Sequence, residues 1–164
     1  MERPPERHPT PPKDWSHEKK AGYIHGNGIV EYETGTHTKW NTSTSTSYHE
    51  GQCVTITPIG MIITGGSDHN NALVWNGKSV SNDDIPNMKY EHQHHCAILF
   101  GDELFVIGGS HTDKVEAFDI KNHQWNPRGE LITQRSNATA TIYDNSIIVI
   151  GGIDARGNYL DTIE

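Results

Sequence analysis

The sequence has no long hydrophobic run and no excess of positive charge. None of its apolar stretches approaches the roughly 20 residues that a membrane-spanning helix needs. Its first residues, MERPP, lack the apolar segment of a signal peptide. The formal net charge of -8 argues against a general phosphate-binding surface. We therefore expect a cytoplasmic protein that binds neither nucleic acid nor membrane.

Cysteine is also scarce, with only Cys53 and Cys96, which are 43 residues apart. If the chain is built from repeats of that length, the two occupy equivalent positions on neighbouring sheets. Packed sheets lie about 10 Å apart, whereas a disulfide needs Cα atoms within about 7 Å. We interpret both residues as small buried thiols, neither bridged nor catalytic.

Apolar residues make up only 33% of the chain, while it contains 16 glycines and 8 prolines. This composition favours many short strands and turns over long helices. Residues 1–20 hold five of the prolines, many charges and almost no apolar side chains. We interpret this segment as a disordered, proline-rich tail.

A fixed period organises the rest of the chain. Three diglycines follow one another at intervals of 43 residues, and each closes an apolar run such as Leu104–Ile107. A constant period of this size indicates a repeat architecture. The three pairs are Gly65-Gly66, Gly108-Gly109 and Gly151-Gly152.

Each repeat reads as four short antiparallel strands. The segments before the diglycines, such as 98–109, are strand, tight turn and strand, with Gly, Asp or Asn in the turn. A third strand is expected at 114–119 and a fourth around Trp125. Four such strands in about 43 residues describe one propeller blade. We therefore predict a partial propeller over 21–164, consisting of a half blade (22–48), two full blades (49–91 and 92–134) and a truncated blade (135–164).

These residues resemble the kelch repeat, in which a hairpin ends in Gly-Gly and is followed by a Val-Glu-x-Tyr/Phe-Asp strand and a Trp. The second full repeat carries the pattern in Gly108-Gly109, Val115-Glu116, Phe118-Asp119 and Trp125. The resemblance covers about 22–164. It departs in the first full repeat, where Asn82 stands in place of the Trp. It implies an all-β, kelch-type β-propeller of about three blades.

The resemblance also implies structural roles for the repeated residues. The six glycines allow positive φ and close backbone approach at the inner end of a blade. Trp125 and its counterpart Trp40 are large apolar side chains that pin an outer strand to its neighbour. Closed kelch propellers have five to seven blades. We expect this chain either to be a fragment or to self-associate through its open blade edges.

Antiparallel alternation places the loops after the diglycines and the loops between blades at the same end of the propeller. Kelch proteins commonly bind partner peptides on this face, and Arg135-Ser136 matches the family's Arg-Ser at the start of a repeat. Polar loops on a rigid scaffold are frequent binding sites. The predicted partner-binding residues are Asp68, His69, His92, His111, Arg135, Ser136, Asp154 and Arg156.

The sequence predicts no metal site, cofactor or catalytic group. The run from His92 to Cys96 contains zinc-type ligands, but His94, His95 and Cys96 are expected on a strand, where successive side chains point to opposite faces. No nucleophile elbow, P-loop or dinucleotide-binding motif is present. We predict a protein-interaction module acting as an adaptor or scaffold. The ubiquitin-ligase and cytoskeletal roles of the family both remain open. The alternative is a propeller enzyme or metal-binding domain that uses the same face.

Overall fold

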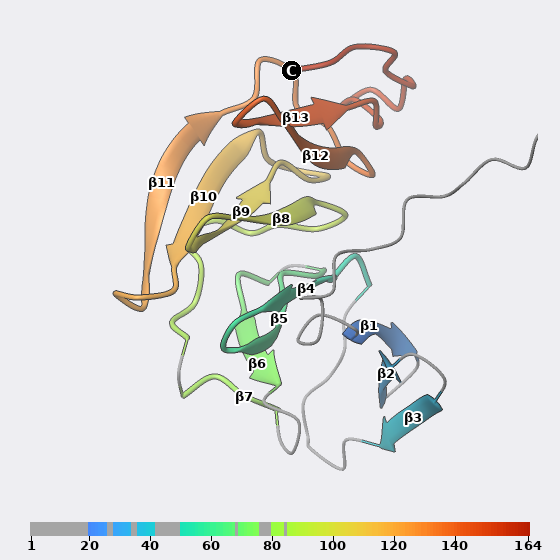
Figure 1. The fold of residues 1–164 in the computed structure, drawn as a ribbon. Helices are drawn as coiled ribbons and strands as arrows, with labels where there is room; N and C mark the ends of the chain where they lie inside the picture. The colour runs from blue at the N-terminus through green and yellow to red at the C-terminus, as the bar shows by residue number, and fades with distance from the viewer. Residues whose placement is uncertain are drawn as a thin grey trace, which may run out of the picture.

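The computed structural model describes residues 20–25, 28–33, 36–41, 50–67, 69–75, 80–83 and 85–164, the first three segments by their backbone alone. All regular secondary structure in these residues is β-strand. Within them, no helix is long and apolar enough to cross a membrane. The strands form four antiparallel sheets that follow one another along the chain (Figure 1).

Each sheet is built from strands that are consecutive in the sequence. The first sheet has three strands, the second and third have four, and the fourth is a hairpin. The strands are β1 (Lys20–His25), β2 (Gly28–Glu33), β3 (Thr36–Asn41), β4 (Cys53–Thr57), β5 (Gly60–Thr64), β6 (Ala72–Trp75), β7 (Val80–Ser81), β8 (Cys96–Phe100), β9 (Glu103–Ile107), β10 (Lys114–Asp119), β11 (Gln124–Glu130), β12 (Thr139–Tyr143) and β13 (Ser146–Ile150).

The period of 43 residues is also the period of the strand pairing. Cys53 lies opposite Thr64, Cys96 opposite Ile107, and Thr139 opposite Ile150. The hairpins β4–β5, β8–β9 and β12–β13 are therefore copies of one unit in one register. The fourth sheet is extended by an isolated bridge between Ile150 and Ile163. This bridge corresponds to the pairing of Ile107 with Val115 in the third sheet.

The sheets stack through their first strands, with β1 beside β4, β4 beside β8, and β8 beside β12. Figure 1 shows β8 to β11 running from the inner to the outer edge of their blade. This is the arrangement of propeller blades. The predicted all-β propeller architecture is confirmed.

Apolar side chains fill the space between successive blades. One cluster joins the second and third sheets and contains Ile62, Val74, Leu104 and Phe118. Another joins the third and fourth sheets through Ile107 and Val149, among others. Strands covered on both faces in this way carry continuous apolar runs, such as those that precede the diglycines.

The outer strands differ between blades. In the third sheet, β11 has seven residues, and the Trp125 ring packs on Phe118 with 5.2 Å between ring centroids. Trp125 Nε1 also donates to the Pro86 carbonyl in the chain that enters this blade, at 2.8 Å. In the second sheet, β7 has two residues. Asn82 there offers no ring to cover the outer strand.

One local prediction was wrong. His94 and His95 precede the strand, because β8 begins at Cys96. His94 has a left-handed backbone with φ 53°, as do Gly51 and Asn137 at the equivalent positions of the neighbouring repeats. The backbone explains this, since the Gly51 carbonyl accepts from the His94 amide and the His94 carbonyl accepts from the Asn137 amide. These bonds link three successive blades. Because of these bonds, His94 has a left-handed rather than an extended backbone, and the strand begins after it.

Candidate functional site

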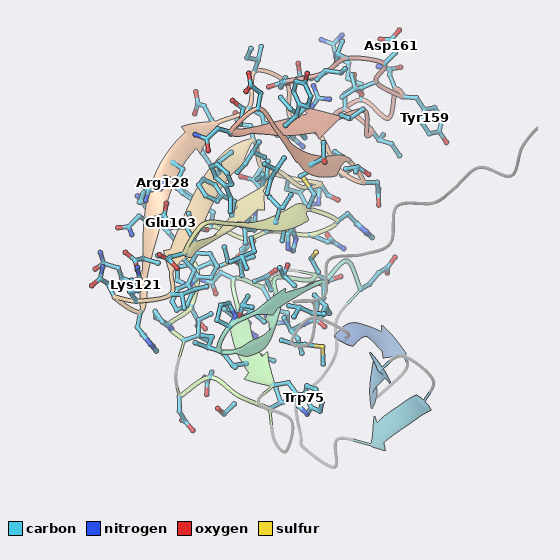
Figure 2. The ribbon with its side chains drawn as sticks, viewed as in Figure 1. Trp75, Glu103, Lys121, Arg128, Tyr159 and Asp161 are labelled. Atoms are coloured by element: carbon cyan, nitrogen blue, oxygen red, sulfur yellow. The ribbon has the colours of Figure 1, made fainter. Side chains whose placement is uncertain are left out.

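The candidate site is the end of the propeller at which the loops of adjacent blades meet. We call it the loop face and define it by segments 65–67, 69–71, 86–95, 108–113, 131–138 and 151–160. The hairpin turns at 58–59, 101–102 and 144–145 and the β10–β11 turn lie at the opposite end, the turn face. Figure 2 shows Tyr159 of the loop face and Lys121 of the turn face on opposite sides of the molecule.

Backbone hydrogen bonds hold the loops of this face together. The Gly66 amide donates to the His92 carbonyl at 2.8 Å, and the Gly109 amide donates to the Arg135 carbonyl at 2.9 Å. The Ser110 amide donates to the Gln93 carbonyl at 2.8 Å. The first two diglycine loops are thereby joined to the segments that lead into the next blades. Hydrogen bonds between neighbouring loops hold this part of the loop face together.

Glycine is required at these contacts by space as well as by conformation. Gly65 has φ +64°, and a Cβ atom there would lie 2.0 Å from the His92 carbonyl oxygen. A Cβ on Gly109 would lie 2.8 Å from the Gln93 carbonyl oxygen. Both distances are shorter than real Cβ contacts, so a side chain would separate the two loops.

A buried histidine–carboxylate contact lies beneath the loop face in the third sheet. The His92 and Glu116 side chains are both 0% exposed, with His92 Nε2 3.1 Å from Glu116 Oε1. His92 Nδ1 lies 2.7 Å from the Gly108 carbonyl oxygen. The Glu116 carboxylate also accepts the amides of Lys89 and Tyr90, at 3.0 and 3.1 Å. The Glu116 carboxylate on β10 therefore holds residues 89–92, which lead into this blade.

The fourth sheet repeats the arrangement with Arg135 in place of His92. The Arg135 guanidinium is 1% exposed, pairs with the Glu164 carboxylate, and donates to the Gly151 carbonyl at 2.7 Å. Glu164 accepts the amides of Ile132 and Thr133, at 2.6 and 3.1 Å. Burial alone would raise the pKa of Glu164. The hydrogen bonds from Arg135 and from the two amides outweigh burial, so the pKa is lowered overall. We call this arrangement in either sheet the carboxylate clamp.

The structure divides the predicted partner-binding residues into two groups. His92, Arg135 and Ser136 are buried, and their polar groups bind other parts of the chain. They lie under the loop face rather than on it. His111 and Arg156 are exposed, and within the described residues neither side chain makes a hydrogen bond or an ion pair. Asp68 and the Trp40 side chain lie outside the described residues, as does nearly all of the predicted tail.

Two further predicted residues belong to the loop face but are engaged there. His69 is half-buried and has an interaction partner within the chain. The Asp154 carboxylate accepts the amides of Arg156 and Asn158, both at 2.8 Å. The Asn158 side chain donates to it as well, at 2.9 Å. Hydrogen bonds from Asn158 hold the pKa of Asp154 below its usual value. Asp154 therefore shapes the 151–160 loop.

His95 lies in the interior beside the carboxylate clamp of the third sheet. Its Nε2 atom is 2.8 Å from Thr64 Oγ1, while Nδ1 is buried without a hydrogen-bond partner. Its ring meets the His92 ring edge-on, with centroids 5.7 Å apart. Burial, assisted by His92, lowers the pKa of His95 to about 3. The imidazole is therefore neutral near pH 7.

The sulfur and imidazole groups do not converge on a metal site in the part of the chain that the structure describes. No group of three or more His, Cys, Asp or Glu side chains there could hold an ion. Cys53 and Cys96 are both free thiols; Cys96 is buried as predicted, whereas Cys53 is only half-buried. Burial raises the pKa of Cys96 to about 11, so its thiol stays protonated.

A recess opens on the loop face between the second and third sheets. It is shallow, with a volume of about 20 Å³, which is room for about one water-sized group, and it is lined by Gly66, Glu91, Gln93 and His111. The sequence pattern placed His111 on this face but did not single out Glu91. The signal that could have found it lies in the period, because position 91 corresponds to Gln134, where the next repeat has an uncharged amide.

The stacked antiparallel sheets and the shared loop face define a β-propeller, of which this chain forms part. The model of the Kelch motif matches residues 93–131 and 134–164. Over these two segments the chain carries Kelch motifs, which confirms the predicted resemblance to the kelch repeat. The predicted kelch-type propeller is thereby confirmed.

Similar proteins occur in several organisms, and two of the following three have kelch names. The chain is 35% identical over 79 residues to Immune evasion protein OPG047 of Vaccinia virus (strain Copenhagen), covering 48% of this chain and 15% of the relative. It is 30% identical over 114 residues to Kelch-like protein 23 of Pongo abelii, covering 63% and 20%. It is 22% identical over 135 residues to Kelch-like protein terF of Aspergillus terreus, covering 74% and 29%. The chain thus spans less than a third of each of these relatives.

A solved structure shows the same fold. The chain superposes on the protein of the "Structure of YjhT" with a TM-score of 0.64 and 16% sequence identity. The match covers 84% of this chain and 48% of that one. At this identity the likeness concerns the fold alone. It is consistent with a partial propeller.

Proposed function

We propose that this chain is a protein-interaction module that binds a peptide or loop of a partner protein on the loop face, as an adaptor or scaffold. The observation that carries the proposal is the combination of a rigid backbone and unengaged polar side chains. Adjacent loops are tied together by hydrogen bonds such as Ser110 to Gln93, while the His111 and Arg156 side chains are exposed and make no hydrogen bond or ion pair with the described residues. Binding residues often occur on loops that a scaffold positions in this way. The names of the kelch-like relatives agree with this role.

The proposal assigns the contact to His111 and Arg156 rather than to His92 and Arg135. The latter two are buried in carboxylate clamps, so replacing them would disturb the fold together with any binding. A cytoplasmic location and the absence of catalysis stay predictions from the sequence. An enzyme on the same face would be revealed by turnover of a small molecule that the loop-face variant loses.

The experiment has two steps. A photo-cross-linking amino acid at position 111 should capture the partner in cells, and the same group at position 121 on the turn face should not. With that partner purified, we expect the double variant His111→Ala/Arg156→Ala to bind at least about tenfold more weakly, the range of a lost charged hydrogen bond. Lys121→Ala is the control, because it also removes a surface cation and Lys121 is exposed. Equal loss in the control, or unchanged affinity in the double variant, would contradict the proposal.

We also propose that the chain self-associates through its open blade face. Ile150 and Ile163 are 43% and 63% exposed on the fourth sheet. Their equivalents in the third sheet, Ile107 and Val115, are covered by the fourth sheet. The exposed face thus presents side chains in the positions that receive the next blade elsewhere in the molecule. A second copy of the chain can supply such a blade, and in a longer protein the next repeat of the same chain would do so.

A further inference from the structure

The recess between the second and third sheets carries an unpaired carboxylate. Glu91 is exposed, and within the described residues it has no hydrogen-bond or ion-pair partner. The cation two residues before it, Lys89, lies over the Tyr90 ring, 5.1 Å from its centroid. The charge of Glu91 is therefore available to a ligand.

The corresponding position in the next repeat shows why Glu91 is unpaired. Gln134 occupies that position, and its Nε2 atom donates to the Ser110 carbonyl at 2.6 Å. The equivalent acceptor for Glu91 is the Ser67 carbonyl, to which an ionised carboxylate cannot donate. One repeat thus satisfies this position internally, whereas the other leaves an acceptor facing outward.

The Gln93 side chain and the Gly66 backbone form the base of the recess, and Gln93 adds a hydrogen-bond acceptor. Gln93 Nε2 donates to Ser67 Oγ at 2.9 Å, which holds the side-chain amide in place and leaves its oxygen free to accept. The Gly66 amide is used by the His92 carbonyl, and Gly66 has no side chain to fill the space. The recess therefore offers the Glu91 carboxylate and the Gln93 amide oxygen, beside the exposed His111 imidazole, and the Gly66 amide at its base is already engaged.

We infer that this recess is a subsite for a cationic side chain, Arg or Lys, of the partner protein. A guanidinium or ammonium group carries only donors, which match the Glu91 carboxylate and the Gln93 amide oxygen. The net charge of -8 favours the approach of a basic segment. The inference rests on the proposed function of the loop face, and it adds the chemistry of one anchor residue.

The test uses short peptides with the intact chain. Acetyl-Ala-Ala-Arg-Ala-Ala-amide and its Lys analogue are titrated against the isotope-labelled protein, and the Gly66 backbone and Gln93 side-chain amides are followed by NMR. The matched neutral probes carry citrulline or acetyl-lysine at the central position. We expect at least one cationic peptide to shift these two signals with an affinity about tenfold or more above that of its neutral analogue.

Two variants locate the charge that matters. Glu91→Gln should abolish the preference for the cationic peptide, because its new amide can donate to the Ser67 carbonyl as Gln134 does to Ser110. The fold should stay intact, since the change copies an arrangement already present in the chain. Asp144→Asn is the control. It makes the same charge change at an exposed turn-face residue with φ 46°, which asparagine also tolerates.

The inference is overturned if the neutral peptides bind as tightly as the cationic ones, or if no peptide shifts the Gly66 and Gln93 signals. It is also overturned if Asp144→Asn reduces the preference for the cationic peptide as much as Glu91→Gln does. Failure of the proposed function looks different. In that case, cross-linking from position 111 captures nothing, whatever the peptides do. If cross-linking succeeds and the peptides fail, the loop face still binds a partner, but without this anchor.

Discussion

At the scale of the residue, burial decides what each titratable side chain can do. The sequence suggested His92 and Arg135 as ligand contacts, but both side chains bind carboxylates inside the protein. His95 is held neutral by its surroundings. Glu91 and His111 keep their polar groups at the surface. Residue type alone therefore did not separate structural from exposed groups.

His95 makes the stability of the chain depend on pH. Its pKa is about 3 in the folded state against 6.5 as the reference for an unfolded chain. Between these values the unfolded state binds more protons, so stability falls as the pH is lowered from about 6.5. From pH 7 to pH 5 we expect His95 to account for a loss of about 2 kcal/mol in the free energy of unfolding.

Urea unfolding at the two pH values measures this loss. The variant His95→Leu should show a shallower fall in stability toward pH 5, whatever its stability at pH 7. His111→Gln should keep the full pH dependence, because that imidazole is exposed and has no partner in the described chain. A His95→Leu variant with the wild-type pH dependence would show that another group is responsible.

At the scale of the element, each clamped blade joins its third strand to its own entry segment. In the third sheet, Glu116 on β10 receives His92 and two backbone amides. The second sheet has Leu73 at the corresponding position, which packs with Met61 and Ile63 instead. The carboxylate clamp is thus a feature of particular blades.

Removal of the clamp carboxylate should be costly. Glu116→Ala leaves buried donors of Lys89, Tyr90 and His92 without an acceptor, and we expect it to lower the free energy of unfolding by about 3–5 kcal/mol. Glu116→Gln should cost less, because its amide oxygen still accepts. Hydrogen exchange of the Lys89 and Tyr90 amides should accelerate in both variants.

The matched control for the clamp is Glu130→Gln, which breaks the exposed pair with Lys114. An exposed ion pair of this kind contributes less than about 1 kcal/mol. If Glu116→Ala were no more destabilising than this control, the clamp would not hold the entry segment.

At the scale of the whole molecule, the exposed face of the fourth sheet is the counterpart of a buried one. Its equivalence to the covered face of the third sheet underlies the proposed self-association. Burying such a face against a second copy would remove apolar area from water, which favours association.

We expect the mass measured by sedimentation equilibrium to rise with concentration above 18.3 kDa. Ile150→Glu should shift this association to at least about tenfold higher concentration, since it places a charge where an apolar contact forms. Tyr159→Glu is the control, because Tyr159 is 88% exposed in a loop outside the β12–β13 hairpin (Figure 2). A monomer at every concentration would contradict the proposed self-association.

The sequence alone determined the propeller fold, the repeat period and the order of the loops. Strand pattern, turn residues and diglycines are local signals, and each of them recurs in three repeats that are 43 residues apart. The same locality explains the error at His94 and His95, because the left-handed residue before β8 depends on bonds to the neighbouring blades.

Only the tertiary structure decided which polar residues reach the surface. His92 and Arg135 turn inward because their carboxylate partners lie 24 and 29 residues away on another strand. Glu91 stays exposed because the nearby backbone acceptor, the Ser67 carbonyl, needs a hydrogen-bond donor. An amide can supply this donor, but a carboxylate cannot. Burial and pairing depend on contacts between distant parts of the chain, which the repeat pattern does not encode.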